Sequence, residues 1–149
     1  MIRYFIFFLL ILAAGCSTTP RGLIIENVNK PLAMLQESVV NSMPVGLRAR
    51  SPNGREFLSK FFVPTKDDFK EADTAPMRWF AHVYILGDRR PYNIEVLVKR
   101  EKRFANRGVL TYRPEGLDLR IASNLKKRIQ DELTKSREGV NLIDDFRAF

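Results

Sequence analysis

The segment Arg78-Trp79-Phe80-Ala81-His82-Val83-Tyr84-Ile85-Leu86 is the most apolar part of the body of the chain. Side chains of a strand alternate between its two faces. One face would carry Trp79, Ala81, Val83 and Ile85, and the other would carry Phe80, His82, Tyr84 and Leu86. A strand with apolar side chains on both faces is expected inside a sheet. The segment 78–86 therefore predicts a central strand on which the domain is built.

Neighbouring segments also show the period of two that is typical of strands. After a turn at 87–91, the inward residues are Tyr92, Ile94, Val96 and Val98. Upstream, segments 45–50 and 56–63 flank the turn signal Ser51-Pro52-Asn53-Gly54 and predict a hairpin. In the second of these segments, Phe57, Phe61 and Val63 are expected on one face and Leu58 and Phe62 on the other. Residues 109–113 would add a short fifth strand.

Two segments have the period of an amphipathic helix. In the first, Asn29 is the expected N-cap, Pro31 lies in the first turn, and Pro44 ends the helix. The second is expected at 118–136, with Gly139 as its stop. Its apolar face is formed by Ile121, Leu125, Ile129 and Leu133.

Two helices and several strands joined by tight turns predict an α+β fold. The expected form is a two-layer sandwich, with two main helices packed on an antiparallel sheet of four to five strands. Residues 23–25 are either a short strand or a segment packed against the first helix. Residues 64–76 are expected to form a polar connection, with one helical turn capped by Thr65. The apolar tail 140–149 either packs on the body or binds a partner.

The N-terminus has the layout of a secretory signal. Arg3 is followed by an apolar run at 4–14 and by small residues that end at Cys16, the one cysteine of the chain. The apolar run is too short for a membrane-spanning helix, which needs about 20 residues.

The run Ala13-Ala14-Gly15-Cys16 resembles the lipobox of bacterial lipoproteins. This resemblance implies cleavage before Cys16, a diacylglycerol on its thiol and a third acyl chain, such as palmitate, on its amino group. Residues 1–15 would be the signal peptide, 16–22 a lipidated tether and 23–149 a single domain. By the sorting rule of enteric-type bacteria, Ser17 implies the outer membrane. A cleaved soluble protein with an incidental cysteine and an uncleaved N-terminal anchor are the alternatives.

Residues that carry chemistry are few. The chain has one histidine, and a single histidine without a free cysteine cannot build a typical zinc site. His82 is interpreted as a hydrogen-bonded or partly exposed strand histidine, with a general base as the alternative. The acidic residues at 67–71 and 144–145 lack the spacing of a calcium loop and are interpreted as solvated. The sequence predicts no catalytic set, no metal and no cofactor.

Basic residues are the stronger signal. The net charge is +8, and it is +7 without Arg3. Such clusters attract polyanions, which at the periplasmic side are lipid phosphates, wall polymers and acidic proteins rather than nucleic acid. The predicted partner-binding residues are Arg89, Arg90, Lys99, Arg100, Lys102 and Arg103. A surface that serves solubility alone is the alternative.

In size, basicity and expected architecture, the body resembles the small lipoproteins of outer-membrane assembly, such as the lipopolysaccharide-assembly lipoprotein. The resemblance implies a non-catalytic lipoprotein, anchored in the outer membrane and facing the periplasm, that binds an envelope component or a protein partner. Two alternatives stay open. One is a small periplasmic hydrolase that uses His82 or the acidic pair Asp67-Asp68. The other is a structural bridge that uses the tail 140–149.

Overall fold

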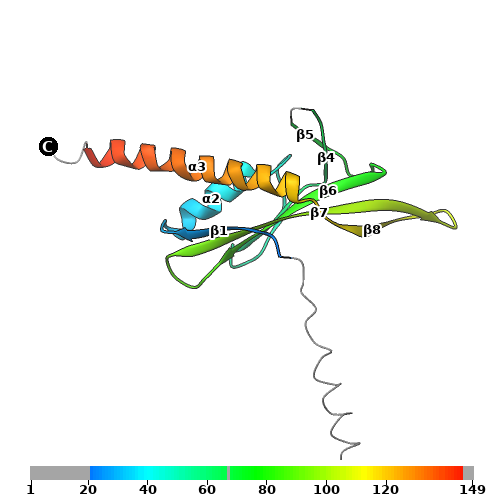
Figure 1. Ribbon diagram of the computed structural model, residues 1–149, viewed down its shortest axis with the longest axis horizontal. Helices are drawn as coiled ribbons and strands as arrows, with labels where there is room; N and C mark the ends of the chain where they lie inside the picture. Colours follow the sequence, from blue (N-terminus) through cyan, green and yellow to red (C-terminus); the bar gives the residue numbers. More distant parts are fainter. Residues whose placement is uncertain (1–20, 67, 146–149) are drawn as a thin grey trace, which may run out of the picture.

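The computed structural model describes the backbone of residues 21–66 and 68–145, and their side chains except those of residues 106 and 136–145. Its strands form one eight-stranded antiparallel sheet (Figure 1). They are β1 (Leu23–Val28), β2 (Leu47–Arg50), β3 (Glu56–Ser59), β4 (Phe62–Pro64), β5 (Phe69–Glu71), β6 (Met77–Leu86), β7 (Tyr92–Asn106) and β8 (Val109–Leu117). The helices of this part of the chain are α2 (Leu32–Ser42) and α3 (Leu119–Asp145).

The centre of the sheet is β6, as its two apolar faces predict. The strand order is β1-β7-β6-β3-β2, so β6 lies between β7 and β3. The long strand β7 is shared along its other edge: its first part pairs with β1 and its second part with β8. Strand β4 pairs with β6 and β5. Since β7 continues where β1 ends, the sheet extends beyond the layer of helices (Figure 1).

Both helices lie over one face of the sheet and enclose the core (Figure 1). The predicted inward residues of the fourth strand are buried, as are those of the second helix. Fully buried side chains such as Phe57, Leu35 and Leu125 meet between the layers. Each such side chain contributes about 1.5–3 kcal/mol through removal of apolar surface from water. The local periods therefore identified most of this core.

The expected two-layer sandwich with four to five strands is wrong. The chain remains α+β, but its sheet has eight strands. The three additional strands are β1, β4 and β5. For residues 23–25 the sequence left open a strand or a segment packed against the first helix. Strand β4 was expected as the end of the strand 56–63, and β5 as part of the connection 64–76. Strand β5 forms where a polar connection was expected; it pairs with β4 in the register Val63↔Lys70.

The predicted strand at 56–63 is broken between β3 and β4. The Ser59 hydroxyl accepts a hydrogen bond from the Ala81 backbone N–H at 2.8 Å, in the place of a ladder carbonyl. After this break the alternation is shifted, so Phe62 is fully buried and Phe61 lies on the other face. The expected faces of Phe61 and Phe62 are therefore exchanged, as an inserted residue predicts.

Helix ends also differ from expectation. Pro31, not Asn29, occupies the N-cap position of α2, and no side chain caps it. Helix α3 continues through Gly139 to Asp145. Several predicted features lie outside the described residues: the signal peptide 1–15, the lipidation site Cys16, Ser17, the tether up to residue 20, Asp67 and residues 146–149. The side chains of residues 140–145 lie outside them as well. The predictions that fall on them remain predictions.

Candidate functional site on the open face of the sheet

The face of the sheet opposite the helices is called here the open face. Along β6 it carries Arg78, Phe80, His82, Tyr84 and Leu86, the second set of the alternation in the sequence. The register places Glu95, Leu97, Lys99 and Glu101 of β7 beside them. In the described part of the chain neither helix lies over these residues (Figure 1). The open face therefore carries both apolar and polar side chains, most of them partly exposed and His82 buried among them.

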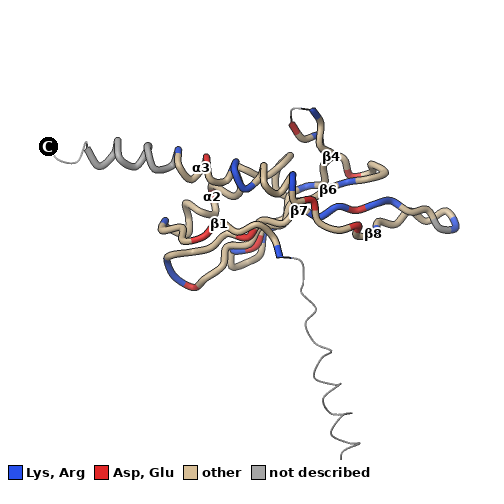
Figure 2. Tube along the Cα trace, in the orientation of Figure 1, with Lys and Arg blue, Asp and Glu red and all other residues tan. Residues whose placement is uncertain are grey.

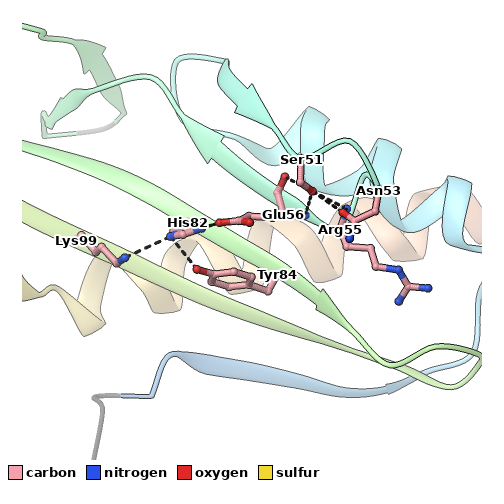
Figure 3. A network of polar contacts seen from close by, with 7 residues as sticks. All are labelled: Ser51, Asn53, Arg55, Glu56, His82, Tyr84 and Lys99. Carbon is pink, nitrogen blue, oxygen red and sulfur yellow. Dashed lines mark hydrogen bonds and ion pairs between the residues drawn. The ribbon is translucent and has the colours of Figure 1, made fainter.

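A polar network is centred on His82 (Figure 3). Its Nε2 lies 2.5 Å from Oε1 of Glu56 on β3. Its Nδ1 lies 3.2 Å from the Tyr84 hydroxyl and 3.3 Å from Nζ of Lys99. The His82 and Tyr84 rings are tilted by 32° with centroids 4.2 Å apart. Three strands thus supply one connected set of titratable side chains.

The environment of His82 favours its neutral form. Its side chain is only 9% exposed, and this burial lowers the pKa of His82 below its ordinary value. The hydrogen bond to Glu56 opposes the shift, while the Lys99 charge adds to it. Since a carboxylate only accepts, Nε2 carries the proton and donates to Glu56. Nδ1 then accepts from Tyr84 and Lys99, which orients both toward the imidazole.

The phenol of Tyr84 is held in its protonated form. Burial and the charges of Glu56 and Glu95 raise the pKa of Tyr84 above its ordinary value. The hydroxyl can therefore donate to His82 while its oxygen accepts from a ligand. This arrangement suits a polar anchor for a bound group.

Beside this network is a hollow of about 640 Å³. Its apolar walls are Ile24, Leu86, Leu97 and Leu117, and its polar groups come from Arg21, Tyr84, Glu95 and Lys99. A few polar groups converging on apolar walls are typical of ligand sites. Arg21 and Lys99 outnumber the one carboxylate of this lining, Glu95, which favours an amphipathic ligand with an anionic group.

A second cluster on the open face surrounds Arg78. Its guanidinium lies between the rings of Phe61 and Tyr112, at 3.5 Å and 3.4 Å from their centroids. Nε and Nη2 both lie 2.9 Å from Oε2 of Glu101, and Nη1 donates to the Asp73 carbonyl at 2.7 Å. Arg78 is therefore a structural clamp between strands rather than a free cation.

The structure does not bring the six predicted partner-binding residues onto one surface. Arg89 and Arg90 lie in the exposed turn between β6 and β7, whereas Arg103 lies about 35 Å along β7 from Tyr92. Figure 2 shows basic residues both at the turn between β6 and β7 and, far from it, along β7. Lys99 and Arg103 share the open face, while Arg100 and Lys102 point to the other side, toward Glu115.

The acidic cluster is also separated. Glu71 pairs with Lys60 at 3.0 Å, and Asp68 lies 3.7 Å from Arg128 of α3. Among the side chains that the structure describes, no group of three histidine, cysteine or acidic residues is arranged to hold a metal ion. Asp67 lies outside the described residues, so the use of Asp67-Asp68 as a catalytic pair stays a prediction.

The sequence did not identify Glu56, Tyr84 and Arg78 as site residues. Alternation alone places His82 and Tyr84 on one face, so their proximity could have been found. Glu56 joins them through the register Leu58↔His82 and Glu56↔Tyr84, which is a non-local property.

Over the described residues, no helix is both long and apolar enough to cross a bilayer. Comparison with protein-family models, with curated proteins and with solved structures finds no match to this chain.

Proposed function

We propose that this chain is a non-catalytic lipoprotein, anchored in the outer membrane through Cys16 and facing the periplasm. In this proposal it binds an anionic envelope component or a protein partner, in the service of outer-membrane assembly. The lipobox-like run that ends at Cys16 supports the anchor. The accessible open face supports the binding role.

One observation carries the binding role: the hollow of the open face lies beside the point where the domain begins. Arg21 lines this hollow, and the Gly22 N–H donates to Glu95 at 2.9 Å. Arg21 follows Cys16 so closely in the chain that even a fully extended connection spans at most about 17 Å. A lipid on Cys16 would therefore hold the open face near the membrane surface.

The anchor is tested by Cys16→Ser. We expect the wild-type chain to incorporate labelled palmitate and to sediment with the outer membrane, and the variant to lose both properties. Ser17→Ala is the matched control, since it changes the neighbouring residue and keeps the thiol. Equal labelling of wild type and Cys16→Ser would contradict the anchor.

The basic surface is tested by charge reversal and crosslinking in the intact envelope, with mass spectrometry of the captured partners. Reversing Lys99 and Arg103, the predicted residues that share the open face, to Glu should reduce capture at least tenfold, because unlike charges steer and hold the complex. The control reverses two exposed basic residues of α3, Arg120 and Lys127. Circular dichroism checks that both variants fold. Equal capture by both variants would contradict the assignment of the basic surface to β7.

A second candidate function is a small periplasmic hydrolase, favoured by the contact of His82 with both a carboxylate and a hydroxyl. General acid–base chemistry needs such partners within hydrogen-bond reach. The test is hydrolysis of purified peptidoglycan and phospholipid by wild type, His82→Gln and Tyr84→Phe. No hydrolysis by the wild type, or equal rates in all three proteins, would remove this candidate.

A further inference from the structure

A two-stranded arm extends from the sheet. Strand β6 begins at Met77, opposite Lys102, and Arg103 is tied to the segment before β6: its backbone N–H donates to the Pro76 carbonyl and its Nη1 to the Thr74 carbonyl, both at 2.8 Å. Beyond this point, residues 104–106 of β7 pair only with residues 109–111 of β8 among the described residues. We call residues 103–113 the arm; it projects away from the helices (Figure 1). A two-stranded ribbon has little core of its own and leaves both faces in water.

Apolar side chains gather at the tip of the arm. In the described part of the chain five large apolar side chains are exposed, and three of them are in the arm: Phe104 at 38%, Val109 at 61% and Leu110 at 60%. The register places Phe104 and Val109 on one face of the ribbon and Leu110 on the other. Exposed apolar clusters on a soluble domain mark contact sites.

Basic residues surround this tip. From Lys102 to Arg113 the chain has four basic residues and no acidic one. Figure 2 shows basic residues along the arm and at its end. The guanidinium of Arg113 lies 5.1 Å from the Phe104 ring centroid, and Nζ of Lys102 lies 6.0 Å from it. The arm therefore carries exposed apolar side chains next to its turn and basic side chains among them.

The turn of the arm has an arginine at a position whose positive φ disfavours it. Arg107 has φ 49° and Gly108 has φ 82°, the signs that a two-residue type I′ turn requires. Asn-Gly is the favoured pair in this turn, because a long side chain is strained at positive φ. Arg107 places a cation at the end of the arm despite this strain.

We propose that the arm inserts its tip into the headgroup region of an anionic lipid bilayer. Apolar side chains on both faces of a thin ribbon suit a medium that surrounds the tip, whereas a protein partner would cover one face. The basic residues would bind lipid phosphates at the surface, and the apolar ones would enter the acyl boundary. The inference deepens the proposed function and rests on its membrane placement.

The test uses the full chain, purified from membranes and reconstituted into vesicles, with Leu110→Trp as the probe. Vesicles contain either phosphatidylcholine alone or a mixture with phosphatidylglycerol. With anionic vesicles, the fluorescence of the introduced tryptophan should shift to the blue and be quenched by brominated lipid, after subtraction of the wild-type signal of Trp79. Leu119→Trp, at a site 56% exposed at the start of α3, is the matched control and should not respond.

Charge variants are then combined with the probe. Arg107→Glu with Arg113→Glu should lower the equilibrium constant for insertion of the tip into anionic vesicles about 30-fold, since each basic residue near the surface contributes to binding. The matched control is Arg89→Glu with Arg90→Glu, the same charge change at the opposite end of the sheet. It should leave the signal of the probe unchanged. Unchanged urea midpoints show that both variants fold.

Several outcomes would overturn the inference: a probe that stays in water, a response that does not depend on lipid charge, or equal loss in both arginine pairs. If the fluorescence shifts to the blue only when another protein is crosslinked to the arm, the arm binds a protein partner instead of lipid. Palmitate labelling of Cys16 is read separately. A labelled chain with an unresponsive probe contradicts the arm alone, and an unlabelled chain with a responsive probe contradicts the anchor alone.

Discussion

At the residue scale, His82 is the best-defined chemical group of the described chain. The sequence allowed a hydrogen-bonded or a partly exposed histidine. The structure gives it three polar partners, Glu56, Tyr84 and Lys99, from three strands. Because His82 is buried in its neutral form, protonation at low pH must oppose folding.

The pH dependence of stability tests this environment. Folding lowers the pKa of His82 from about 6.5 in the unfolded chain. The unfolded state therefore binds more protons below that value, and the free energy of unfolding falls as the pH decreases through about 6.5 toward the lower pKa of the folded state. We expect urea unfolding to show this decrease in the wild type and a flatter profile in His82→Gln. His82 is the one histidine of the chain, so the difference belongs to it.

Tyr84→Phe is the control, since it removes a partner of His82 and keeps the imidazole. It should retain the decrease of stability toward low pH. Parallel profiles for wild type and His82→Gln would contradict a neutral, buried His82.

At the scale of elements, the start of α3 is set by one side chain. Oδ1 of Asp118 accepts from the Ile121 N–H at 3.1 Å, which is the N-cap interaction. Oδ2 of the same residue accepts from Trp79 Nε1 at 3.1 Å. Asp118 thus begins the helix and ties it to the central strand.

Asp118→Ala should lower the free energy of unfolding by about 1–3 kcal/mol, through loss of the cap and of the hydrogen bond to Trp79. Asp118→Asn should cost less than Asp118→Ala, because the amide oxygen can keep the cap while the amide NH₂ cannot accept from Trp79. Urea unfolding followed by circular dichroism measures both. Equal losses in the two variants would show that charge, and not capping, is the cause.

At the scale of the molecule, Arg78 joins the arm to the body. It contacts Phe61 next to β4, Glu101 on β7 and Tyr112 on β8, and its side chain is 14% exposed. The Tyr112 hydroxyl also donates to the Ala75 carbonyl at 3.0 Å. These contacts fix the direction in which the arm leaves the sheet.

Arg78→Lys should lower the free energy of unfolding by about 1–3 kcal/mol, because an ammonium cannot stack between two rings and bind a carboxylate with two nitrogens. A double-mutant cycle with Tyr112→Leu should show coupling above about 0.5 kcal/mol. Arg48→Lys is the control: Arg48 also lies over Phe61, at 4.1 Å, but is exposed. Additive effects of Arg78→Lys and Tyr112→Leu would contradict the clamp.

From its local periods, the sequence determined the central strand β6, the inward face of β7 and the buried face of α3. Each depends only on which residues recur at two, or at three and four, along the chain. It also determined that the chemistry-bearing residues are few, since one histidine and one cysteine allow few sites.

The tertiary structure decided the rest. The hydroxyl of Ser59 interrupts the strand after β3 and exchanges the faces of Phe61 and Phe62. The pairing of β8 with the charged residues 99–103 of β7 was also not encoded locally. The contact of Glu56 with His82 and the clamp of Arg78 both depend on register. Register and pairing are set by contacts between residues far apart in the chain, and no local pattern encodes them.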